Sequence, residues 1–162
     1  MKNLQKGFTL IELMIYTALF AIVLGISVDF FFLSKTIATE VTQYQEVDRN
    51  ARVVFLDMSQ TIRGATSVTT PTLGQSASEL VLNGGAITYA TGSAGVLQKT
   101  EGGNTSDLTA DSVEISNVMF TTRGEAGDKA TVSISFTMQT KTRVYGKPDY
   151  ITKDFQTTVQ LR

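Results

Sequence analysis

Residues Phe8–Leu33 read FTLIELMIYTALFAIVLGISVDFFFL, a long apolar run that contains only two charged residues, Glu12 and Asp29. As an α-helix with a rise of about 1.5 Å per residue, this run would span roughly 39 Å, which exceeds a hydrocarbon core of about 30 Å. Lys2 and Lys6 precede the run and no acidic residue does. Because such lysines stay on the cytoplasmic side, the run predicts a single membrane-spanning helix with an exported C-terminal part.

Two ordinary alternatives compete with a specialised helix here. A secretory signal peptide would have a shorter apolar region followed by a small-residue cleavage site, and no clear site of that type follows this run. An uncleaved signal anchor would have no need of Glu12. A carboxylate at the centre of a membrane helix costs about 3 kcal/mol, and less near an end, so its presence indicates a partner or a function.

The residues Lys6–Leu13, KGFTLIEL, resemble the signature of type IV prepilins and type II secretion pseudopilins. The resemblance implies that a prepilin peptidase cuts between Gly7 and Phe8, and that the same enzyme methylates the new amine of Phe8. Gly7 suits a cleavage site, because a residue without a Cβ lets the backbone extend into a protease cleft.

The same resemblance gives Glu12 a role in assembly. It implies that Glu12 neutralises the amine of Phe8 on a neighbouring subunit as the new subunit leaves the bilayer. Two such charges attract strongly at low dielectric, and removal of one leaves the other buried without compensation. The implied partners are other pilin subunits, the prepilin peptidase, an inner-membrane assembly platform and the lipid bilayer. The implied location is the inner membrane, then a fibre in the periplasm or at the cell surface.

Beyond Leu33 the helical period continues with one apolar face. The residues that follow this period are Val41, Tyr44, Val47, Ala51, Phe55, Met58, Ile62 and Ala65. Their three- and four-residue steps predict one helix from Phe8 to about Ala65, apolar all round in its first half and along one stripe in its second. Gly64 and the following Thr/Ser-rich segment favour its end there.

The remainder of the chain predicts an antiparallel sheet that packs on this stripe. We expect strands at Glu79–Asn83, Ala86–Ala90, Val96–Lys99, Ser112–Thr122, Ala130–Thr140 and Asp154–Leu161, and a loop at Glu101–Asp111. In Ser112–Thr122 the alternation slips by one residue near Ser116-Asn117, which indicates a β-bulge. The predicted fold class is α+β and pilin-like, with a leader (1–7), a membrane or fibre-core half-helix (8–35) and a globular head (36–162).

The composition disfavours an enzyme. The chain has no histidine and no cysteine, so Ser-His hydrolysis and an ordinary zinc site are both excluded. Four of its acidic residues, Asp107, Asp111, Glu125 and Asp128, lie in expected loops, and Glu101–Asp111 lacks the spacing of an EF-hand calcium loop. We therefore expect no catalytic residue, no metal site and no cofactor. The net charge of −1, which becomes more negative when Lys2 and Lys6 leave with the leader, gives no basic surface for nucleic acid.

Within the family, the chain is most similar to J-type minor pseudopilins and related minor pilins. The similarity lies in Val47–Ala65, in the ITY and VLQK segments, and in Val132–Lys141. Many major pilins carry a proline in the membrane half of the helix, whereas this chain has none between Phe8 and Ala65. We expect a minor filament subunit with a role in initiation or near the tip; the alternatives are a major pilin and an uncleaved, signal-anchored binding domain.

Overall fold

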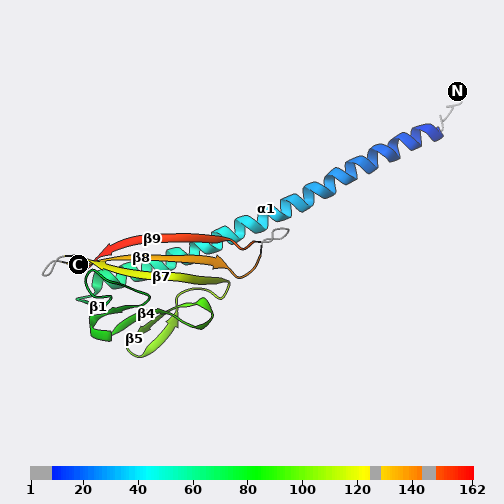
Figure 1. The fold of residues 1–162 in the computed structure, drawn as a ribbon. Helices are drawn as coiled ribbons and strands as arrows, with labels where there is room; N and C mark the ends of the chain where they lie inside the picture. The colour runs from blue at the N-terminus through cyan, green and yellow to red at the C-terminus, as the bar shows by residue number, and fades with distance from the viewer. Residues whose placement is uncertain (1–8, 125–128, 144–148) are drawn as a thin grey trace, which may run out of the picture.

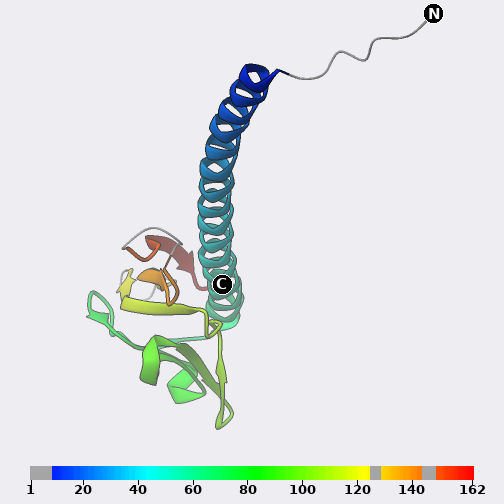
Figure 2. The ribbon, with the colours of Figure 1, turned by 90° about the vertical axis from the view of Figure 1, so that its right-hand side faces the viewer.

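The computed structural model describes residues 9–124, 129–143 and 149–162. One helix, α1 (Leu10–Gly64), runs through the whole first part of the chain. Its N-terminal half projects away from the rest, and its C-terminal half lies along a β-rich head (Figure 1). Seen from the side, the head covers one flank of the lower half of α1 only (Figure 2). The predicted long helix is confirmed.

The head contains two antiparallel sheets rather than the single sheet predicted. The first sheet has the order β1-β3-β4-β5-β6, with β1 (Val68–Thr70), β3 (Leu80–Leu82), β4 (Ile87–Thr91), β5 (Leu97–Glu101) and β6 (Asn104–Asp107). The second has the order β2-β7-β8-β9, with β2 (Ser76–Ala77), β7 (Val113–Arg123), β8 (Thr131–Thr140) and β9 (Thr152–Gln160). Short 3₁₀ turns at Asn83–Gly85 and Ser93–Gly95 flank β4.

The second sheet packs on α1, and its strands β7, β8 and β9 make most of the contacts between the helix and the two sheets. The alternation predicted for β8 is confirmed, because Val132, Ile134, Phe136 and Met138 are all buried. The β-bulge is also confirmed. The pairing of β7 with β8 shifts register between Ser116 and Met119, and Asn117 has a φ of 51°.

The helix face that packs on the head differs in part from the predicted stripe. Its buried residues are Val47, Asn50, Ala51, Val54, Met58 and Ile62. Val41 and Tyr44 are exposed, because the buried face of α1 begins only at Val47, although Gln43 already donates a hydrogen bond to the Arg143 carbonyl of the head. Phe55 is at the edge of the core, where its ring centroid lies 5.0 Å from that of Phe136.

Three short strands were not predicted. β1 and β2 have only a few residues each and lack apolar alternation. β6 falls inside Glu101–Asp111, which was predicted to be a loop, and all four of its residues are exposed. The loop prediction was wrong because β6 forms by pairing with the edge of β5, an interaction that needs no apolar side chains.

Candidate functional site

The N-terminal half of α1 is an apolar surface that nothing in the described chain covers. Every Leu, Ile, Val, Met and Phe from Leu10 to Leu33 is exposed. α1 is long and apolar enough to cross a membrane, as predicted from the sequence. A continuous exposed surface of this size is typical of a segment that lies in lipid or packs against other proteins.

Glu12 lies in the first turn of α1 and is hydrogen-bonded to Thr9, the residue that caps the helix. Thr9 is the N-cap of α1, and its Oγ1 accepts a hydrogen bond from the Glu12 backbone N–H at 3.3 Å. The Thr9 hydroxyl in turn lies 3.5 Å from Glu12 Oε2. A carboxylate in the first helical turn also interacts favourably with the helix dipole. Glu12 thus has a local role in starting α1, which was not predicted although the T-x-x-E spacing is typical of a capping box.

The other two residues of the predicted assembly site, Gly7 and Phe8, lie outside the described residues. The cleavage between them, the methylation of Phe8 and the pairing of its amine with Glu12 therefore remain predictions. The structure places the start of α1 at Leu10, directly after these positions.

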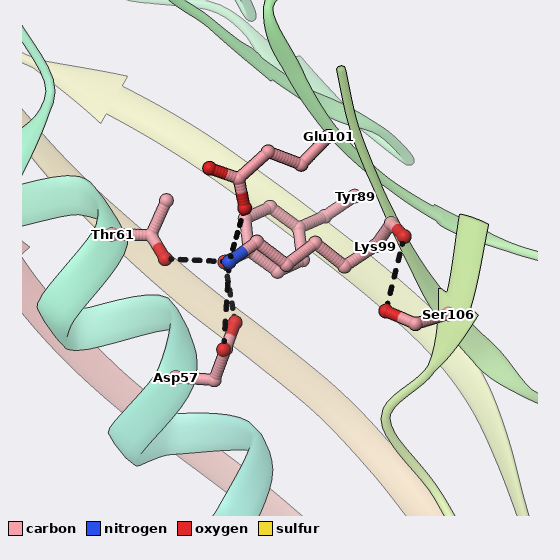
Figure 3. Close-up of polar contacts among 6 residues, drawn as sticks. All are labelled: Asp57, Thr61, Tyr89, Lys99, Glu101 and Ser106. Atoms are coloured by element: carbon pink, nitrogen blue, oxygen red, sulfur yellow. Dashed lines mark hydrogen bonds and ion pairs between the residues drawn. The ribbon is translucent and has the colours of Figure 1, made fainter. Parts of the chain in front are cut away.

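A polar cluster joins the other end of α1 to the first sheet (Figure 3). The Tyr89 hydroxyl on β4 donates a hydrogen bond of 2.6 Å to Asp57 Oδ1 on α1. Lys99 on β5 lies between two carboxylates, 3.6 Å from Asp57 Oδ2 and 3.0 Å from Glu101 Oε2, and its Nζ is 3.4 Å from Thr61 Oγ1. The Tyr89 ring itself is fully buried in the core.

The charge states of this cluster indicate a structural role. Burial and the hydrogen bond to Asp57 raise the pKa of Tyr89, so its hydroxyl stays protonated and acts as a donor. Burial lowers the pKa of Lys99, but the hydrogen bond with Glu101 and the charge of Asp57 outweigh this, and the pKa lies above its ordinary value. An amine held in the cationic form is a poor nucleophile and a poor base at neutral pH. The cluster therefore fastens β4 and β5 to α1.

A second polar contact fixes the segment before β7. Asn50 is buried on α1, its side-chain oxygen accepts from the Ala110 N–H at 2.9 Å, and its amide donates to Glu46. The Ser112 hydroxyl donates to Glu46 Oε1 at 2.9 Å. The sequence alone indicates no role for Asn50, because a single polar residue within an amphipathic helix forms no recognisable pattern.

Among the described residues, no three His, Cys, Asp or Glu side chains come together to hold a metal ion. Glu101 and Asp107 lie at opposite ends of the β5–β6 hairpin, where Glu101 pairs with Asn104 and Asp107 pairs with Gln98.

One comparison with known proteins gives a match. A family model described as the prokaryotic N-terminal methylation motif matches residues 2–28. No curated protein and no solved structure matches the chain significantly. The matched residues contain Gly7, Phe8 and Glu12 together with most of the exposed apolar run Leu10–Leu33. The chain is thus similar to type IV pilin-like prepilins in its N-terminal motif and in its long apolar helix packed on antiparallel sheets.

Proposed function

We propose that the chain is a minor subunit of a type IV pilus-like or type II secretion pseudopilus filament, with a role in initiation near the tip. It is made as an inner-membrane protein with an exported head. Cleavage after Gly7 releases the leader 1–7, Phe8 becomes the methylated N-terminus, and residues 8–35 pass from lipid into the fibre core. Residues 36–162 form the head.

The observation that carries this proposal is the two-part surface of α1. The N-terminal half, most of which lies within the methylation motif, exposes all its large apolar side chains, and the C-terminal half packs on the head through Val47–Ile62. A simple anchor needs a lipid-length segment only. Here the helix continues without interruption from that segment into the core of the head, so the head is rigidly tied to whatever surrounds the apolar half.

A minor subunit is favoured over a major pilin by the helix itself. α1 contains no proline, and its one glycine in the apolar half, Gly25, has no neighbour within 4 Å of an added Cβ. The apolar half therefore lacks the proline found in many major pilins. The resemblance of Val47–Ala65 to J-type pseudopilins points the same way.

The deciding measurement is the intact mass of the protein recovered from membranes and from sheared fibres. We expect a mature chain that begins with N-methylphenylalanine at position 8. Gly7→Val, which adds a branched Cβ at the cleavage position, should leave the precursor at full length in the membrane. A parent protein that begins at Met1, or near Ser27, would rule out the proposal.

A further inference from the structure

The described strands of the head leave four sheet edges, and the edge formed by β9 differs from the other three. β1, β2 and β6 have three, two and four residues. β9 has nine residues, contains no proline and pairs with β8 without a register shift from Thr152 to Gln160. Natural sheets shorten, bulge or otherwise protect their exposed edges, so a long regular edge is a template for pairing with another chain.

The backbone groups of β9 alternate between β8 and the free edge. The Thr140 N–H donates to the Ile151 carbonyl, and the Leu161 N–H donates to the Ala130 carbonyl, each at 3.0 Å. Because successive residues of a strand direct these groups to opposite sides, odd-numbered positions of β9 bond to β8 and even-numbered positions face outward. No described strand pairs with the outward groups, and the residues that carry them are all exposed: Thr152, Asp154, Gln156, Thr158 and Gln160.

Charged side chains protect only the start of this edge. Lys153 Nζ lies 2.7 Å from Asp48 Oδ1 on α1, and Asp154 follows it. The remainder, residues 155–160, contains no charged residue. Its outward N–H and C=O groups recur every second residue, about 7 Å apart. An extended segment presents its own donors and acceptors at that spacing, whereas a helix uses them internally.

A groove lies beside the free edge, where β9 runs along α1 (Figure 2). It has a volume of about 380 Å³ and is lined by Asp48, Ala51, Arg52, Phe55, Leu56, Ser59 and Phe155. Leu56 is exposed, and Phe55 and Phe155 are partly buried with their ring centroids 6.2 Å apart. Alternate side chains of a strand added to β9 would point toward α1, so this groove can receive an apolar one.

We infer that an extended segment from the head of a different pilin subunit adds to β9 as a further strand of the second sheet. The inference rests on the proposed function, because other pilins are the neighbours of a minor subunit in its fibre. Backbone hydrogen bonds to Gln156, Thr158 and Gln160 hold the segment, and an apolar side chain of the segment covers Leu56. Main-chain bonds supply the affinity in this mode of recognition, and the groove supplies the selectivity.

A proline at an outward position tests the backbone contact. Gln156→Pro removes an N–H that faces the free edge and leaves the bonds between β8 and β9 in place, and sheets tolerate proline at edge positions of this kind. Gln156→Ala is the matched control, because it removes the same side chain and keeps the N–H. We expect Gln156→Pro to lower crosslinking to other pilins in intact fibres several-fold, and Gln156→Ala to crosslink like the parent.

Membrane level, cleavage after Gly7 and protease resistance of the head should be the same in both variants and the parent. If Gln156→Pro crosslinks like the parent, or if Gln156→Ala loses as much as Gln156→Pro, the backbone of β9 is not the contact and the inference is wrong.

A probe in the groove decides the question even if Gln156→Pro unfolds the head. The native chain has no cysteine, so Arg52→Cys can carry a short photoactivatable crosslinker in intact fibres. We expect a product with a head segment of a different pilin. Val53→Cys is the matched control, since it is also exposed but points about 100° away around α1 and does not line the groove. Equal yields, or a product only with lipid or with a second copy, would overturn the inference.

The mature N-terminus separates this inference from the proposed function. If Phe8 begins the mature chain and the parent enters fibres, yet both tests fail, this inference is wrong and the proposed function stands. If the mature N-terminus is not Phe8, the proposed function itself fails and the inference falls with it.

Discussion

The Tyr89 hydroxyl on β4 donates a 2.6 Å hydrogen bond to the Asp57 carboxylate on α1. The two residues are far apart in the sequence, and they join the helix to a sheet that otherwise makes few contacts with it, because α1 packs mainly on β7, β8 and β9. A buried hydroxyl requires an acceptor, and Asp57 provides it. This bond, with the ion pair from Lys99, therefore sets how the first sheet sits on α1.

A protein that begins at Thr36 should be soluble, monomeric and folded. The exposed apolar half of α1 is then gone, while the helix residues that face the sheets, Val47 to Ile62, are kept. Gel filtration and a single cooperative unfolding transition would confirm this. Aggregation, or unfolding without cooperativity, would show that the head depends on the removed half.

In this shortened protein, Asp57→Ala should lower the free energy of unfolding by about 2–3 kcal/mol, because it leaves a buried Tyr89 hydroxyl without its acceptor. Tyr89→Phe removes the donor together with the need for it and should lower the free energy by only about 1 kcal/mol. Urea unfolding gives both values. Glu101→Ala is the matched control, since this more exposed carboxylate also contacts Lys99 and should change stability by about 0–1 kcal/mol. Equal losses for Asp57→Ala and Glu101→Ala would contradict the assignment.

The same cluster predicts loss of stability at alkaline pH. The pKa values of Tyr89 and Lys99 both lie above their ordinary values, so the folded head holds these protons more tightly than the unfolded chain does. Their contribution to stability is therefore fully present below about pH 10 and decreases as the pH rises beyond the ordinary values. Unfolding measured from pH 8 to pH 11 should show this decrease. Tyr89→Phe should make it less steep, and an unchanged slope would show that Tyr89 does not contribute.

The two clearest sequence patterns, the helical period of α1 and the alternation of β8, correctly predicted a helix and a strand. Both predictions hold because each element buries one apolar face against the core of the head. The stripe was wrong at Val41 and Tyr44, since the helical period alone does not show which turns of α1 the sheets cover. The edge strands β1, β2 and β6 escaped prediction for a different reason: backbone pairing with a neighbour forms them, and their side chains carry no repeat.

The helix face can be checked residue by residue. Met58 is fully buried, so Met58→Ala should lower the free energy of unfolding by about 2–5 kcal/mol. Phe55 is only partly buried beside Phe136 and Phe155, so Phe55→Ala should lower it by about 2 kcal/mol, less than for a fully buried phenylalanine. Leu56→Ala is the control on the exposed side and should lie within about 0.5 kcal/mol of the parent. If Leu56→Ala lowered the free energy of unfolding more than Met58→Ala, the face of α1 that packs on the sheets would have been assigned wrongly.

The candidate site could be predicted from the sequence only where its residues are local. The motif around Glu12 is contiguous and was found directly. The contacts of Asp57 with Tyr89 and Lys99, and of Asn50 with Ala110, join distant segments, and their partners are set by the way the sheets fold onto α1. No spacing rule within the sequence indicates them.

The pairing of Glu12 with a neighbouring amine predicts an effect on assembly alone. In a simple anchor, Glu12→Ala removes a charge from lipid, so insertion should be unchanged or improved. In a filament it leaves the Phe8 amine of the neighbour without its partner, and incorporation should fall while membrane level and cleavage after Gly7 persist. The structure adds a second effect, because Glu12 also contributes to the N-terminal turn through Thr9.

Glu12→Gln separates the loss of charge from the loss of the cap, since its amide keeps the shape and the capping position but not the charge. Thr9→Ala is the matched control that weakens the cap and keeps the charge. We expect Glu12→Gln to reduce crosslinking to neighbouring pilins nearly as much as Glu12→Ala, and Thr9→Ala to reduce it much less. A Glu12→Gln variant that crosslinks like the parent, beside a Thr9→Ala variant that does not, would show that Glu12 acts by starting the helix and not by pairing with Phe8.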